Sequence, residues 1–418
     1  MRTSRAFITG LGVVAPTGVG TAEHWANSLR GASGIGPLPA PDPGDGGRPA
    51  PVRTAGQVPG FDADAFVDTR LAVQTDRGTW MALAAARLAL DDARLTPDQE
   101  FPFDLSVVTA AGSGGNAFGQ REIQALWSQG PRKVSAYQSI GWFYAASTGQ
   151  ISIRHQLKGA CGVVVSDGAG GIDALAQARR LIRRRTGAVL VGGTEAPLSP
   201  YALVCQSDQY GISHGTDPRT AYRPFGGEGF VPGEGGAMLV VESEERVRRR
   251  GLRVYAEILS TAATQDGWDP AEPAPDGAQF TRAVREALRR ADCAPDDIDV
   301  VFADGAGTAV GDRQEAGMIR AVFGTRSVPV TVPKTMTGRL CSGGASLDLA
   351  WAALALSHRV IPPSVNLAPA AEYADLDLVT HPREVPDLRT ALVVARGTGG
   401  FNAAAVLRGP AGAGTDTG

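Results

Sequence analysis

A helix-strand unit that occurs twice is the feature that most constrains the fold of this 418-residue chain. Residues 80–98 show the apolar spacing of a helix, and a strand that runs into glycine, LSVVTAAGSGG, follows them. The same order returns at residues 280–296, ahead of IDVVFADGAGT. Aligning Ala93 with Ala291 also aligns the Pro-Asp pair that follows each helix. The repeat predicts a chain built from two similar halves.

Further segments of the two halves match in the same order. They are strands 162–165 and 328–332, helices 168–182 and 341–356, which both have glycine-rich starts, and strands 188–197 and 391–400. Because each half alternates helices with apolar strands, we expect a layered α/β protein whose parallel strands are buried on both faces. We place the halves at 1–250 and 251–418. Gly and Pro make up half of residues 31–60, so we expect an extended surface excursion there, and we expect the tail from Gly409 to fray.

Composition excludes several classes of function. Forty basic and 43 acidic residues leave a net charge of −3, which makes nucleic acid an unlikely principal partner. No apolar run is long enough to span a membrane, and the chain opens with a strand pattern rather than a signal peptide, so we expect a cytoplasmic protein. The four cysteines are far apart and form no CxxC motif, which indicates neither a disulfide framework nor a metal site. We expect reduced, mostly buried thiols and no cofactor.

Three short motifs have simpler explanations than the chemistry they suggest. Residues 10–15 fit GxGxxA, but the second strand of a dinucleotide-binding unit does not follow, so we expect a tight turn. The glycine-rich segment 226–236 lacks the GK[ST] of a phosphate loop and predicts a permissive loop. Val164 stands where a GxSxG elbow around Ser166 needs glycine. The five histidines share no spacing, and we expect them to be surface or packing residues.

The phrases VVVSDGAGGIDAL, ADGAGTAVGDRQEA and KTMTGRLCSGGA resemble the β-ketoacyl synthases of the thiolase superfamily. More closely, the chain resembles the chain length factor, or ketosynthase β subunit, of type II polyketide synthases. Matching phrases extend from ITGLGVVAPTG to RGTGGFNAA and so cover almost the whole chain. The resemblance implies a thiolase-like fold, with duplicated α/β halves in a layered α-β-α-β-α architecture.

The resemblance also implies that the catalytic triad is absent. A condensing synthase of this family uses a Cys at the start of its central helix, with two His nearby to support thiolate and oxyanion. Those three positions fall on Gly168, Asp304 and Arg339, and we expect the last two to form a charge-assisted bridge in the former pocket. Lys334 remains, and we interpret it as a buried structural partner. Cys161 and Cys341 have no local His to act as a base, so a displaced nucleophile is not indicated.

In the resembling family this subunit pairs with a catalytic ketosynthase α subunit, and malonyl units arrive on an acyl carrier protein. The growing chain lies in a tunnel at the interface of the two subunits. The aromatic stretch 137–144 suits a surface covered by the partner, although a buried core helix fits it equally well.

The resemblance places the gate of that tunnel on a helix after Gly115, at Asn116, Gly119 and Ile123, which share one helix face. We expect an open tunnel because Gly119 has no side chain; the alternative is that Gly119 only permits close helix packing. An alternative function is a free-standing β-ketoacyl synthase-like acyltransferase with a non-standard nucleophile.

Overall fold

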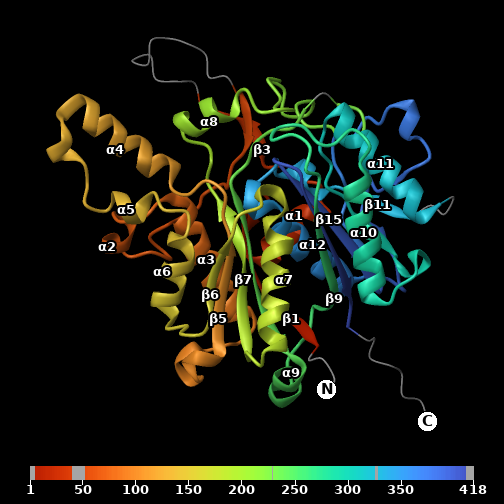
Figure 1. Cartoon of the computed structure of the whole chain (residues 1–418), viewed down its shortest axis with the longest axis horizontal. Helices are drawn as coiled ribbons and strands as arrows, with labels where there is room; N and C mark the ends of the chain where they lie inside the picture. The colour runs from red at the N-terminus through yellow and green to blue at the C-terminus, as the bar shows by residue number, and fades with distance from the viewer. Residues whose placement is uncertain (1–4, 40–51, 228, 325–327, 411–418) are drawn as a thin grey trace.

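The computed structural model describes residues 5–39, 52–227, 229–324 and 328–410. Within the expected surface excursion 31–60, residues 40–51 lie outside the described ranges, and so does most of the tail, 411–418. The described parts form one large mixed sheet, with helices on both faces and between its halves, and two small two-stranded sheets (Figure 1).

Five strands of each half follow the same order in the large sheet. In the N-terminal half the order is β6 (Cys161–Val164), β5 (Leu105–Ala110), β7 (Ala188–Glu195), β8 (Gly235–Ser243) and β1 (Ala6–Ala15), and β2 (Gly18–Val19) pairs with β1 beside them. In the C-terminal half it is β11 (Pro329–Thr331), β10 (Val300–Phe302), β15 (Thr390–Gly397), β16 (Phe401–Arg408) and β9 (Ala256–Gln265), with β13 (Asp377–Leu378) beyond β11. The first three strands of each half are parallel and the last two are antiparallel to their neighbours. The duplication predicted from the sequence is therefore confirmed, and the parallel strands expected in each half are joined by antiparallel ones.

The halves join through a short antiparallel contact between β1 and β9, at Phe7 with Glu257 and Ile8 with Ala256. Helices α7 (Gly170–Arg183) and α12 (Gly344–His358) share one buried cluster with both halves of the sheet. The outer faces are covered by α3 (Arg77–Asp92) and α6 (Ala146–His155) on one side, and by α10 (Ala278–Ala291) and α11 (Ala309–Phe323) on the other. This gives the expected α-β-α-β-α layers (Figure 1). Every residue from 345 to 356 is buried, which explains why α12 has no polar face.

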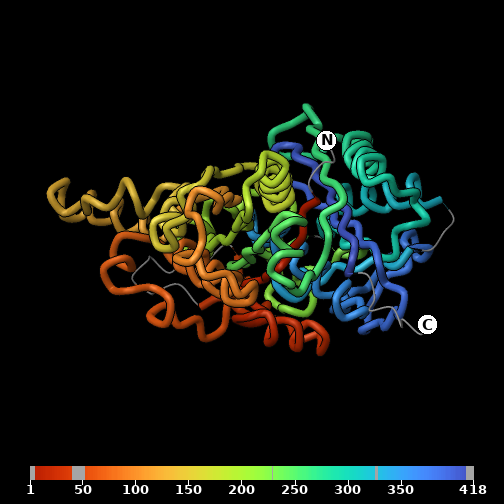
Figure 2. Tube along the Cα trace, turned by 90° about the horizontal axis from the view of Figure 1, so that it is seen from below, coloured from red at the N-terminus to blue at the C-terminus, as the bar shows by residue number. Residues whose placement is uncertain are grey.

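The smaller elements surround this core. They are α1 (Thr21–Leu29), α2 (Thr69–Ala72), α4 (Asn116–Gln129), α5 (Gln138–Gly141), α8 (Pro200–Gln206), α9 (Glu244–Arg250), and the short strands β2 (Gly18–Val19), β3 (Ile35–Pro37), β4 (Thr54–Gly56), β12 (Val360–Ile361) and β14 (Arg383–Glu384). Helices α4 and α5 form an arm that extends away from the body of the molecule (Figure 2). None of the helices in the described ranges is long and apolar enough to cross a membrane.

The glycines near the N-terminus have a different role from the one expected. Residues 10–15 are not a tight turn, because β1 runs through them with a register shift between Ile8 and Gly10. A Cβ on Gly12 would lie 1.9 Å from the backbone oxygen of Ala85, and one on Gly10 would lie 2.4 Å from that of Ala89. These two glycines let α3 pack directly on the strand.

Three other expectations are wrong in part. The excursion 31–60 is not wholly at the surface, because β3 and β4 pair and residues 52 and 54–56 are buried. The thiols are not mostly buried: Cys161 and Cys205 are exposed, and Cys293 and Cys341 are half-buried. The strand β6, which is the last strand of its half, is only partly buried: Cys161 is exposed and residues 162–164 are half-buried. In contrast, His24 has the expected packing role, with its ring 4.9 Å from that of Trp351.

Candidate functional site

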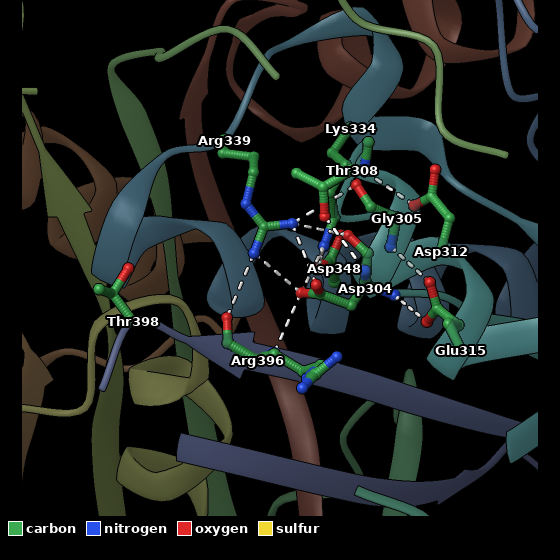
Figure 3. A network of polar contacts seen from close by, with 12 residues as sticks. Asp304, Gly305, Thr308, Asp312, Glu315, Lys334, Arg339, Asp348, Arg396 and Thr398 are labelled. Atoms are coloured by element: carbon green, nitrogen blue, oxygen red, sulfur yellow. Dashed lines mark hydrogen bonds and ion pairs between the residues drawn. The ribbon is translucent and has the colours of Figure 1, made fainter. Parts of the chain in front are cut away.

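The structure brings together the three positions that the resemblance assigns to a lost triad. Gly168 lies in the turn that leads from β6 into α7, and Asp304 follows β10. Arg339 lies between β11 and α12. All three line one cavity of about 110 Å³, together with Lys334. The N-terminal half thus contributes Gly168 to this site. The C-terminal half contributes Asp304, Lys334 and Arg339, whose side chains point toward one another (Figure 3).

Asp304 and Arg339 form the expected ion pair in this cavity. The guanidinium is bidentate: Nη1 donates to Oδ2 at 3.1 Å and Nη2 donates to Oδ1 at 3.1 Å. The Asp304 side chain is 3% exposed and that of Arg339 is 19% exposed. Burial opposes ionisation of Asp304, but Arg339 and the nearby Lys334 ammonium hold the pKa of its carboxyl below the usual value. The pair is thus a charge-assisted, partly dehydrated contact.

Further contacts fix both partners of this ion pair. Arg339 also donates to the backbone oxygens of Asp304 at 3.0 Å and of Arg396 at 3.2 Å. The backbone N–H of Arg396 donates to Asp304 Oδ1 at 3.0 Å. Lys334 is buried, with its Nζ 2.7 Å from Asp348 Oδ2 and 3.9 Å from Asp304 Oδ1. Lys334 and Arg339 are therefore each paired with a carboxylate of this chain.

Two buried carboxylates that were not predicted from the sequence shape the loop that carries Asp304. Glu315 Oε1 accepts the N–H of Asp304 at 2.7 Å, and its Oε2 accepts that of Gly305 at 2.8 Å. Asp312 accepts the N–H of Gly307 at 2.9 Å. Burial raises the pKa of each of these two carboxyls to about 7. A signal existed, because Asp312 and Glu315 are three apart in α11, directly after a glycine-rich loop.

Gly168 leaves no room for a side chain. A Cβ at this position would lie 2.3 Å from the backbone oxygen of Arg396 and 3.5 Å from Nη2 of Arg339. The first distance is far below a van der Waals contact, and its partner is backbone rather than a flexible side-chain end. The place where the resemblance puts a nucleophile is thus filled by a main-chain carbonyl.

Of the two cysteines considered as displaced nucleophiles, only Cys341 lines the cavity. Burial raises the pKa of its thiol well above the ordinary value, and the carboxylates of Asp167 and Glu195 raise it further. A thiol in this environment stays protonated and is a weak nucleophile. No histidine is among the described residues that line the cavity, so a general base of that kind is absent there.

The three residues assigned to the tunnel gate lie elsewhere, on α4, and do not line this cavity. Asn116 Nδ2 donates to Ser113 Oγ at 2.9 Å. Gly119 is buried, and a Cβ there would lie 2.8 Å from Cδ1 of Trp142. The Ile123 side chain is exposed on the arm. Across the described ranges, no cluster of three or more His, Cys, Asp or Glu side chains is arranged to hold a metal ion.

Comparisons with known proteins agree with this architecture. The chain matches the β-ketoacyl synthase N-terminal domain over residues 3–246 and the β-ketoacyl synthase C-terminal domain over residues 255–368. It is 51% identical over 406 residues to the tetracenomycin polyketide synthase ketoacyl synthase β subunit of Streptomyces glaucescens, covering 96% of this chain and 97% of that one.

Solved structures show the same likeness. The ishigamide ketosynthase/chain length factor matches with a TM-score of 0.89 at 25% identity, over 98% of this chain and 100% of that one. A type II polyketide synthase acyl-carrier protein in complex with its ketosynthase bound to the hexaketide matches with a TM-score of 0.87 at 26% identity, over 98% and 100%. This chain therefore belongs to the β-ketoacyl synthase family, within which it is similar to a ketosynthase β subunit over nearly its whole length.

Proposed function

We propose that this chain is a non-catalytic chain length factor, the ketosynthase β subunit of a type II polyketide synthase. It pairs with a ketosynthase α subunit, which condenses malonyl units delivered by an acyl carrier protein. One observation carries the proposal. Where a condensing synthase needs a thiol and two imidazoles, this chain has Gly168 under a main-chain carbonyl, and Asp304 bound to Arg339.

The chemistry of the site supports assigning catalysis to the partner. A decarboxylative Claisen condensation needs a thiolate to carry the acyl chain and donors that stabilise the oxyanion and enolate. In this chain the Arg339 guanidinium is held by the Asp304 carboxylate, and Lys334 is held by Asp348. The α subunit therefore supplies the nucleophile and both bases, and this chain supplies one wall of the tunnel.

A broad apolar surface on the N-terminal half supports pairing with another protein. The aromatic stretch 137–144 is not a core helix, because Tyr137, Trp142, Phe143 and Tyr144 are exposed. On the edge strand β6, Cys161 is exposed, and Val165 beyond it is 53% exposed. Solvent-facing aromatic side chains and an open strand edge are each typical of a surface that a partner covers.

We propose that α4 carries the gate at Asn116, Gly119 and Ile123, and that residue 119 influences product length. A Gly119→Phe variant, coexpressed with the α subunit and the carrier protein, is then expected to change the length of the polyketides, because its ring must displace the Trp142 indole; the released products are measured by mass spectrometry. Ser128→Phe is a matched control because Ser128 is exposed near the far end of α4, on its opposite face. Unchanged product length in Gly119→Phe, with normal pairing, excludes this gate.

The proposal as a whole is tested by purifying the chain alone and with its α subunit and assaying condensation of malonyl groups on the carrier protein. The alternative, a free-standing acyltransferase, has only Cys341 as a cavity thiol, and its raised pKa argues against it. We place the two halves at 1–250 and 251–418 and propose that the protein acts in the cytoplasm. Both an aromatic poly-β-ketone and a reduced polyene are compatible products.

A further inference from the structure

The start of the α4 arm packs against the end of α5 and the residue after it at positions where glycines leave no space for a side chain. A Cβ on Gly115 would lie 1.9 Å from the backbone oxygen of Gly141, and one on Gly114 would lie 2.3 Å from that of Trp142. On the other side, a Cβ on Gly141 would lie 2.7 Å from the ring of Phe118. The separation of these two segments is therefore set by main-chain contact and by one buried ring, which leaves little freedom to adjust it.

Gly119, one turn further along α4, meets a side chain instead of backbone. The three atoms nearest to its missing Cβ all belong to the Trp142 indole: Cδ1 at 2.8 Å, Nε1 at 3.6 Å and Cγ at 3.8 Å. The indole of Trp142 thus fills the space that a side chain at position 119 would occupy. Gly119 alone does not open a passage here, because Trp142 lies in it.

The indole is held in place by packing and not by polar contacts. Trp142 is 53% exposed, and its ring nitrogen donates to no protein acceptor within the described ranges. Its backbone is fixed, since its N–H donates to Gln138 at 3.3 Å and its carbonyl accepts from Gly115 at 3.2 Å. The backbone of Trp142 is therefore fixed. Its indole, which only packing restrains, can change position by rotation about the side-chain bonds.

We propose that Trp142 is a specificity-determining residue for product length: its indole closes the space over Gly119, and its size limits how far the growing chain extends along α4. This inference rests on the proposed function, because it assumes that the polyketide reaches this face of α4. An uncharged growing chain would replace the apolar contacts that the indole makes with α4.

The test uses the complete complex of this chain with its α subunit and carrier protein. Trp142→Ala removes the indole and is expected to shift the products to longer chains by at least one two-carbon unit. Gly119→Phe combined with Trp142→Ala refills the space and is expected to restore the parental length. Trp127→Ala is the matched control. Trp127 lies on α4, as Gly119 does, and is 83% exposed, but none of its atoms is among the three nearest to a Cβ on Gly119. Trp142→Phe guards against loss of pairing, since it keeps an aromatic surface.

The outcomes separate this inference from the proposed function. If the parental complex pairs and makes polyketides while both Trp142→Ala and Trp142→Phe give the parental length, Trp142 does not limit the product. If the parental chain does not pair or supports no polyketide, the proposed function itself fails. A second measurement does not depend on turnover. Gly119→Ala is expected to displace the indole and increase acrylamide quenching of tryptophan fluorescence, and this increase should vanish in a Trp142→Phe background.

Discussion

Replacing Asp304 by alanine tests the buried ion pair that takes the place of the catalytic residues. The change leaves the Arg339 guanidinium, 19% exposed, without a paired carboxylate, and it removes an acceptor from the Arg396 N–H. Backbone oxygens and the Phe230 ring remain next to the guanidinium. Leaving one member of a buried pair uncompensated costs about 3–5 kcal/mol of unfolding free energy. Arg339→Met should cost less, because Asp304 keeps the Lys334 ammonium at 3.9 Å.

The assay is a double-mutant cycle followed by urea denaturation of the purified chain, with fluorescence and circular dichroism as probes. The double variant should cost less than the sum of the single variants, with a coupling energy of about 1–3 kcal/mol. Asp375→Ala is the control, since its ion pair with Arg320 is exposed and worth at most about 1 kcal/mol. A coupling energy below about 0.5 kcal/mol would refute the argument that Asp304 and Arg339 stabilise each other.

Three further predictions follow from single sites. Gly168→Ala should lower the unfolding free energy by about 1–3 kcal/mol in urea titrations, because its methyl group would collide with the Arg396 carbonyl; an unchanged midpoint contradicts the crowding. Burial raises the pKa of the Glu195 carboxyl from 4.5 to about 7, so the free energy of unfolding falls as pH rises between those values. Glu195→Gln should remove up to about 3 kcal/mol of that fall. An unchanged dependence of the unfolding free energy on pH in this variant contradicts the shift. Iodoacetamide at pH 8 should label exposed Cys161 well before Cys341, as mass spectrometry of peptides would show; equal rates contradict the raised thiol pKa of Cys341.

The architecture could be predicted from the sequence because the same helix-strand unit occurs in both halves of the chain. Matching helix-strand units fixed the order of elements in each half, and the phrases around Gly168, Asp304 and Arg339 identified residues that meet in one cavity. The ion pair also followed from residue type, since a carboxylate and a guanidinium facing one pocket attract each other.

The features that could not be predicted from the sequence depend on contacts between segments that are far apart in the chain. The spacing of Gly10 and Gly12 is typical of a turn, but these residues lie in a strand. Because they have no side chains, α3, some 75 residues further along the chain, can pack directly on that strand. Whether β6 is central or at an edge is a property of strand order, which its own residues do not encode. The contact of Gly119 with Trp142 crosses from one helix to the segment after another, and helix periodicity along α4 alone carries no information about it.

The central claim, that this chain shapes the product but does not perform the condensation, is tested most directly by separating the two subunits. Condensation of malonyl groups on the carrier protein should be measured with this chain alone, with the complex, and with a complex whose α subunit has its nucleophilic cysteine replaced by alanine. The account predicts turnover by the intact complex only. Turnover by this chain alone, or by the complex without the α-subunit thiol, would contradict it.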